Sequence, residues 1–363
     1  MNLARAWLVR AALLALGVGS GGCGLLGGVR VEAVATSAQK PANVAAYLAV
    51  SAGDEPLTEL EAKNFHVYEN GQELDARQIQ RSLLSRETVT HERVLLLVDV
   101  SGQPTPEQRA AYAHAVEAFV RKLQPSLSVS VRAFDGSPGL KSLGDFPRGG
   151  AAAGASPLLK LNPKDASRDL HGAVVAGLAE LDRAAQASPK PVELGTLVVF
   201  ANGPDLAGRT DERQLDEALE KTEHAVIGIV VGPDAGYLGF ARDGVIHAQA
   251  ADTLPIAFEE AGARVAATHA KYYLLSYCSP ARAGTRRARV EVVYEDKDGG
   301  EHSGSVEFEL DATGFGPGCN AETLPRFERQ QAAATAQGAR VNQSTESDPA
   351  VVVPPPSTNE YAK

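Results

Sequence analysis

Residues 93–99 read Arg-Val-Leu-Leu-Leu-Val-Asp, and the chain continues as Val-Ser-Gly-Gln. A continuous apolar run of this length, closed by polar residues and glycine, is typical of a strand that is buried on both faces of a parallel sheet. Residues 104–123 then place alanine, phenylalanine and leucine side chains at helical spacing. This segment therefore predicts a strand, a polar loop and a helix, in that order.

The same order of strand and helix recurs three more times. Strands are expected at residues 127–134, 196–201 and 224–231, and helices at residues 170–185, 211–221 and 253–267. This alternation predicts an α/β fold with a Rossmann-like, doubly wound sheet that carries helices on both faces. In such a sheet the ligand crevice lies beyond the carboxyl ends of the strands. The rim of the crevice is expected at residues 99–105, 165–172 and 202–209.

The segments at this edge resemble a known family. Residues 95–101, 170–173 and 198–209 resemble, in that order, the von Willebrand factor type A domain, and the likeness extends over about residues 92–269. The resemblance implies a Rossmann-like domain that binds protein ligands through a metal-ion-dependent adhesion site. The family builds this site from an Asp-x-Ser-x-Ser loop, a Thr of a second loop and an Asp of a third. Magnesium suits such oxygen ligands, and it leaves one position for a carboxylate of the partner.

This chain departs from the family's pattern, so its site is degenerate. Asp99 and Ser101 match the first loop, but Gln103 replaces its second serine. Arg168 stands where the threonine is expected, and Asn202 replaces the aspartate. Because an arginine keeps its proton and repels a nearby divalent ion, we expect the guanidinium to take the place of the ion and to pair with Asp99. The candidate ligand-binding residues are Asp99, Ser101, Gln103, Arg168, Asn202 and Asp205.

The residues leave other interpretations of the site open. In one, Asp165, Asp169 or Asp205 supplies the missing carboxylate. Arg168 then points to solvent, and magnesium binds at Asp99 and its serine. In another, the guanidinium receives a partner's carboxylate through a bidentate fork. In a third, the ion pair is structural and binds no ligand. The expectation is a site without metal or other cofactor.

Segments with alternating apolar residues flank this domain. Before it, strands are expected at residues 29–36 and 46–50, and residues 65–74 predict a hairpin with an Asn-Gly turn. After it, strands are expected at residues 272–277, 288–294 and 304–310. Because neither set alone makes more than about three strands, we expect one β-sandwich with the α/β domain inserted into it. The alternative is two small, independent β modules. The expected boundaries are 1–22 for a signal peptide, 23–91 and 270–320 for the sandwich, 92–269 for the α/β domain and 321–363 for a disordered tail.

The N-terminus has the plan of a secretory signal, with arginines, an apolar run and small residues before Cys23. A cysteine at this place resembles a bacterial lipoprotein signal, which implies acylation of Cys23 and a stable membrane anchor. Gly24 favours the outer membrane in this resemblance. The alternative is ordinary signal cleavage with an incidental cysteine. Cys278 and Cys319 are expected to form a disulfide, because the exported chain meets an oxidising compartment.

Charge and motifs narrow the functional classes. The 363 residues carry 35 Lys+Arg against 45 Asp+Glu, a net charge of −10, which argues against a nucleic-acid partner. The sequence contains no H-E-x-x-H motif, G-x-S-x-G elbow or P-loop, so we expect no enzyme. The expected function is protein recognition or adhesion without metal, by an exported, lipid-anchored protein that faces the periplasm or the cell surface. The alternative is a structural or assembly component of the cell envelope whose site is vestigial.

Overall fold

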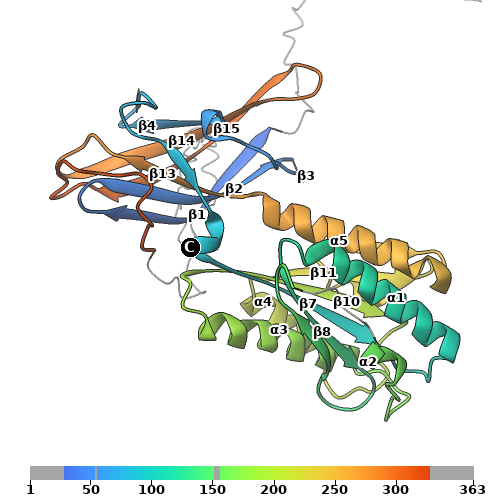
Figure 1. Ribbon diagram of the computed structural model, residues 1–363. Helices are drawn as coiled ribbons and strands as arrows, with labels where there is room; N and C mark the ends of the chain where they lie inside the picture. Colours follow the sequence, from blue (N-terminus) through green and yellow to red (C-terminus); the bar gives the residue numbers. More distant parts are fainter. Residues whose placement is uncertain (1–27, 54, 151–155, 328–363) are drawn as a thin grey trace, which may run out of the picture.

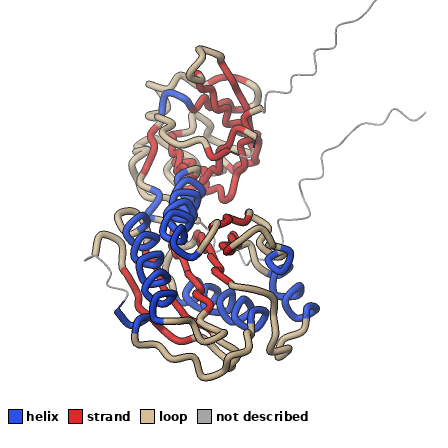
Figure 2. Tube along the Cα trace, turned by 90° about the vertical axis from the view of Figure 1, so that its right-hand side faces the viewer, coloured by secondary structure: helices blue, strands red, loops and turns tan. Residues whose placement is uncertain are grey.

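The computed structural model describes residues 28–53, 55–150 and 156–327. They form an α/β part around sheet C and a β-sandwich of sheets A and B (Figure 1). Figure 2 shows the strand-rich sandwich above the α/β part, with helices on both sides of sheet C. The fold class expected from the sequence is confirmed. The expected signal peptide of residues 1–22, the expected anchor residue Cys23 and most of the expected tail lie outside the described residues.

Sheet C has the strand order β12-β11-β10-β7-β8-β9. The apolar residues 94–98 form half of β7, and each of their side chains is buried. Successive side chains of a strand point to opposite faces, so Val94, Leu96 and Val98 pack on one face of the sheet, whereas Leu95 and Leu97 pack on the other. The strands are β7 (Thr90–Asp99), β8 (Ser128–Phe134), β9 (Lys141–Phe146), β10 (Val192–Ala201), β11 (Ala225–Val231) and β12 (Val245–Ala248).

Helices cover both faces of sheet C, as Figure 1 shows. On one face α1 (Pro106–Leu123) and α5 (Leu254–Ala270) bury their apolar sides, with the short α2 (Ser156–Leu159) beside α1. On the other face lie α3 (Leu170–Ala187) and α4 (Glu212–Lys221). Single turns of 3₁₀ helix occur at Ala62–Asn64, Arg86–Thr88, Gly236–Leu238 and Ala251–Thr253.

Both sheets of the sandwich combine strands from before and after the α/β part. Sheet A contains β1 (Val29–Gln39), β2 (Asn43–Ala52), β3 (Glu55–Pro56), β6 (Ser82–Leu84) and β13 (Tyr272–Cys278). Sheet B contains β4 (Phe65–Glu69), β5 (Gln72–Glu73), β14 (Thr285–Glu295) and β15 (Glu301–Asp311). One apolar core lies between the sheets and draws on both sets of strands. The structure therefore shows the arrangement of an inserted α/β part, not two independent β modules.

Several details differ from the sequence-based expectations. β9 and β12 extend sheet C at its two edges, and β9 runs antiparallel to β8. Residues 321–327, assigned to the disordered tail, pack on the sandwich because Phe327 is buried among Tyr47, Leu274 and Val192. The Cys278–Cys319 disulfide is present, as expected. No helix in the described part of the chain is long and apolar enough to cross a membrane.

Candidate functional site

The predicted rim lies at the carboxyl edge of sheet C. Asp99 is the last residue of β7, which lies between β10 and β8 in the sheet. The loop that begins at Asn202 follows β10, and Arg168 lies in the loop that leads into α3. Carboxyl ends of parallel strands meet at one edge, so loops from three distant parts of the sequence converge on Asp99.

The Asp99 carboxylate is completely buried and accepts three hydrogen bonds. Its Oδ1 accepts the Ser101 N–H at 2.9 Å. Its Oδ2 accepts the Asn202 N–H at 2.9 Å and the Nε–H of Arg168 at 2.5 Å. Two of these donors are backbone groups of different loops, and the third is a charged side chain. The ion pair expected between Arg168 and Asp99 is present.

Arg168 connects the loops in a second way. Its Nη1 donates to the Pro204 carbonyl at 3.0 Å, and its own carbonyl accepts the N–H groups of Leu206 and Ala207 at 2.8 and 2.9 Å. A Cβ at Gly203 would lie 2.8 Å from Nη1, so only glycine lets the loop approach the guanidinium this closely. Arg168 is 8% exposed, so its side chain contacts the surrounding loops far more than it contacts solvent.

The residues present do not fit a divalent ion. A metal ion on the Asp99 carboxylate would lie within a few ångströms of the bound guanidinium. At about 4 Å a unit charge repels another by about 4 kcal/mol at an effective dielectric constant of 20, and a divalent ion doubles this cost. Within the described ranges no group of three His, Cys, Asp or Glu residues is arranged to hold a metal. The buried Ser101 Oγ has no hydrogen-bond partner among these residues, and a single hydroxyl does not replace the missing ligands.

The alternative carboxylates are engaged elsewhere. Asp165 accepts hydrogen bonds from the N–H and Oγ–H of Ser167 and pairs with Arg209 at 3.2 Å. Asp169 caps α3 through the Gly172 N–H at 3.2 Å, and burial, followed by the charge of Asp205, raises its pKa. These side chains hold the loops, and none of them contacts Asp99 in place of Arg168.

The remaining predicted residues are less closely assembled. Asp205 accepts hydrogen bonds from the N–H groups of His171 and Gly208, so it connects the loop after β10 to the start of α3. Asn202 is exposed, and its Nδ2 donates to the Tyr112 hydroxyl at 3.1 Å. Gln103 is exposed and has a left-handed backbone with φ of 53°. The structure thus brings Asp99, Ser101, Arg168 and Asn202 together and leaves Gln103 and Asp205 at the periphery.

Asp135 supports the same rim from the end of β8. Its carbonyl accepts the Asp169 N–H at 3.2 Å, directly before α3. Burial raises the pKa of the Asp135 carboxyl, but hydrogen bonds from Lys141 Nζ at 2.5 Å and from the N–H groups of Lys164 and Ser137 outweigh this effect. Its pKa therefore lies well below the usual aspartate value.

Sequence reasoning missed Leu206. Its side chain is 65% exposed, and its own backbone N–H donates to the Arg168 carbonyl from the loop after β10. The signal was an apolar residue inside a stretch of Asn, Gly, Pro and Asp, where a solvated loop has no need for one. Leu206 is a single exposed apolar side chain on the predicted rim, and we add it to the candidate residues on the basis of this position.

Comparison with known proteins finds similarity to solved structures. Neither a protein-family model nor a curated protein matches the chain. Similar solved structures include a von Willebrand factor type A protein from Catenulispora acidiphila, with 13% identity, a TM-score of 0.41, and coverage of 79% of this chain and 74% of that one. Manganese-loaded TRAP protein from Plasmodium vivax has 12% identity, a TM-score of 0.40, and coverage of 64% and 97%. Proximal thread matrix protein 1 from the mussel byssus, with a zinc-occupied MIDAS motif, has 14% identity and a TM-score of 0.38. The match covers 55% of this chain and 49% of that one, so this chain spans about half the length of the mussel protein.

The strand order of sheet C and the helices on both its faces define the class of fold: a Rossmann-like α/β domain flanked by a β-sandwich.

Proposed function

We propose that this chain is an exported, lipid-anchored envelope protein whose rim at the carboxyl edge of sheet C binds a protein partner without a metal ion. The observation that carries the proposal is the buried Arg168–Asp99 pair, which fixes three loops at the place where the related family uses a cation. A rim held by charges of the chain itself is preorganised, and this lowers the entropic cost of binding.

The exposed side chains of the rim support a protein partner. Leu206 offers an apolar contact, and Gln103, Asn202 and Pro204 are exposed polar or rigid residues of the same rim loops. An apolar centre with a polar border is the usual anatomy of a recognition surface. The proposal includes no catalysis, because the buried carboxylates Asp99 and Asp169 hold backbone N–H groups.

Binding to envelope extracts tests the rim. Immobilised full-length protein is compared with Leu206→Ser and Arg168→Ala, and Leu324→Ser serves as the matched control, because Leu324 is 55% exposed and lies beside the sandwich. We expect a partner that both rim variants lose and that the control retains, with no effect of a metal chelator. A partner that survives both rim variants would favour the structural or assembly role instead. Loss in the presence of chelator, or calorimetric binding of magnesium or manganese tighter than about millimolar, would contradict the metal-free site.

The membrane anchor is tested separately. Residues 1–22 and Cys23 provide the sequence support for it. Labelling with a palmitate analogue should mark the wild-type protein and not Cys23→Ala, and the variant should leave the membrane fraction. Equal labelling of both proteins would contradict acylation at this residue.

A further inference from the structure

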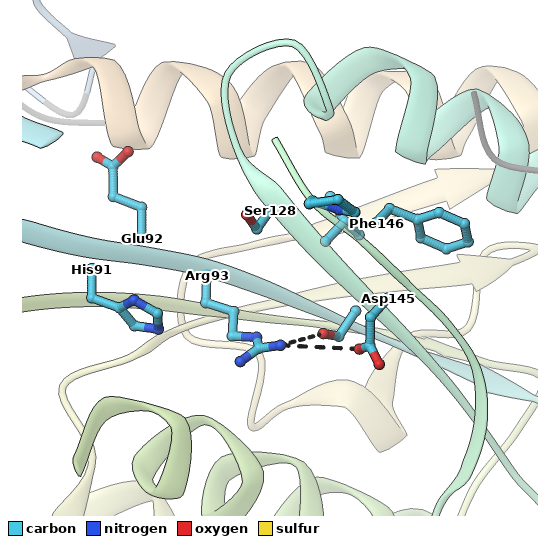
Figure 3. A pocket seen from close by; sticks show the side chains of 9 residues that line it. His91, Glu92, Arg93, Ser128, Asp145 and Phe146 are labelled. Carbon is cyan, nitrogen blue, oxygen red and sulfur yellow. Dashed lines mark hydrogen bonds and ion pairs between the residues drawn. The ribbon is translucent and has the colours of Figure 1, made fainter. Parts of the chain in front are cut away.

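A cavity of about 210 Å³ lies at the amino edge of sheet C, opposite the rim. It forms where β7 and β8 begin and β9 ends, and Figure 3 shows the side chains that line it. Its size suits a ligand of about ten non-hydrogen atoms rather than a drug-sized molecule.

Two basic side chains in the cavity have hydrogen-bonding capacity left. Arg93 is 34% exposed at its side chain; its Nη2 donates to Ser130 Oγ at 3.2 Å and lies 4.0 Å from Asp145. A guanidinium offers five N–H donors, so most of them remain for a ligand. The Nε2 of His91 is buried and has no hydrogen-bond partner among the described residues. Figure 3 shows both side chains extending from the same side of β7, with the guanidinium between His91 and Asp145.

The carboxylates near the cavity are already paired. Asp145 binds Arg132 at 2.9 Å, and Glu92 lies 3.1 Å from the Nε of Arg86. Burial, followed by the charges of Arg93 and Lys190, lowers the pKa of His91. The lining residues with hydrogen-bonding capacity left therefore include Arg93 and His91, and also Glu92, whose buried Oε1 has no hydrogen bond among the described residues.

The other walls of the cavity are apolar and come from Val129, Phe146 and Pro147. We propose that this cavity binds a small carboxylic acid with an apolar body. The carboxylate accepts hydrogen bonds from the free N–H groups of Arg93, and the body packs against Phe146. A free organic acid and the C-terminal carboxylate of a peptide both offer this chemistry.

Calorimetry with phenylacetate tests the proposal, with phenylacetamide as its uncharged isostere. We expect saturable binding at about millimolar concentration, as fits a ligand of this size. Arg93→Gln should weaken it at least about tenfold, because a charge-assisted bond is lost. Arg213→Gln, an exposed ion-pair residue on α4, should bind as the wild type does. N-acetylphenylalanine, a mimic of a peptide C-terminus, separates the two sources: tighter binding than phenylacetate assigns a peptide, and weaker binding assigns a free acid.

Three results would overturn the proposal: no saturable binding of either acid, equal binding of the amide, or wild-type affinity in a folded Arg93→Gln protein. Amide resonances that shift on titration should include residues 91–93, 128–130 and 145–146, and shifts confined to other residues would also contradict it. Because the rim lies at the opposite edge of sheet C, these outcomes are independent of the partner-binding experiment.

Discussion

Replacing Arg168 with methionine tests the claim that a guanidinium, and not a metal, holds the rim. Arg168→Met keeps most of the side-chain volume but leaves the completely buried Asp99 carboxylate without its charged partner. Removing one member of a buried ion pair costs about 3–5 kcal/mol. For a chain of this size, that lowers the unfolding midpoint of the α/β part by about 10 °C. Thermal and urea unfolding followed by circular dichroism measure the loss.

Two further variants make this result specific. Arg209→Met breaks an ion pair with Asp165 in which Arg209 is 46% exposed, so it should cost less than about 1 kcal/mol. Adding Asp99→Asn to Arg168→Met removes the stranded charge, and the double variant should be more stable than the sum of the single losses predicts, by about 1–3 kcal/mol. A loss below about 1 kcal/mol for Arg168→Met, or strict additivity in the double variant, would refute the reasoning.

Three other predictions follow from buried groups elsewhere. Folding lowers the pKa of Asp135, so its ionised carboxylate stabilises the protein above the ordinary aspartate pKa of about 4, and this stabilisation is lost as the pH falls. Asp135→Asn should therefore be less stable than wild type at pH 7, and the difference between the two unfolding midpoints should shrink in acid. A difference that stays constant with pH would argue against this account. Replacing both Cys278 and Cys319 with serine opens a loop with a sequence separation of 41 and should cost about 4 kcal/mol in urea unfolding, whereas an unchanged midpoint would contradict it. Phe327→Ala should lower the free energy of unfolding by about 3 kcal/mol, because the ring fills the junction between the sandwich and sheet C. The control Leu324→Ala should leave the free energy of unfolding almost unchanged, because Leu324 is exposed. Equal losses in the two variants would refute this role of Phe327.

The strands and helices that build sheet C were predictable because each carries its own signal. The apolar run of β7 requires burial on both faces, and α1 begins at Pro106, after the N-cap residue Thr105 and its capping box. The Asn70-Gly71 turn joins β4 to β5 as expected, with both residues at positive φ. The pairing of Arg168 with Asp99 was predictable from charge, once the resemblance had placed the two residues in facing loops.

Other features depend on contacts that no local pattern reveals. β9 is polar and half-buried and contains Gly144, so it lacks the apolar run that identifies the other strands, and β12 has only four residues. The cavity at the amino edge was invisible for the same reason, because Arg93 meets Asp145 only when the unpredicted β9 pairs with β8. Phe327 is one aromatic residue in a polar segment, and its burial follows from the shape of the junction.

A tethered guanidinium and a bound ion hold a site in physically different ways. The occupancy of an ion site follows the free ion concentration, so an ion stabilises its site by an amount that changes with the medium. Arg168 is part of the chain and pairs with a completely buried carboxylate, so salt screens the pair far less than it screens a surface pair. The three loops of the rim should therefore keep their arrangement at any divalent-ion concentration. In the proposed function, control of binding then rests with exposed residues of the rim such as Leu206, which is why a substitution there is expected to remove the partner without unfolding the domain.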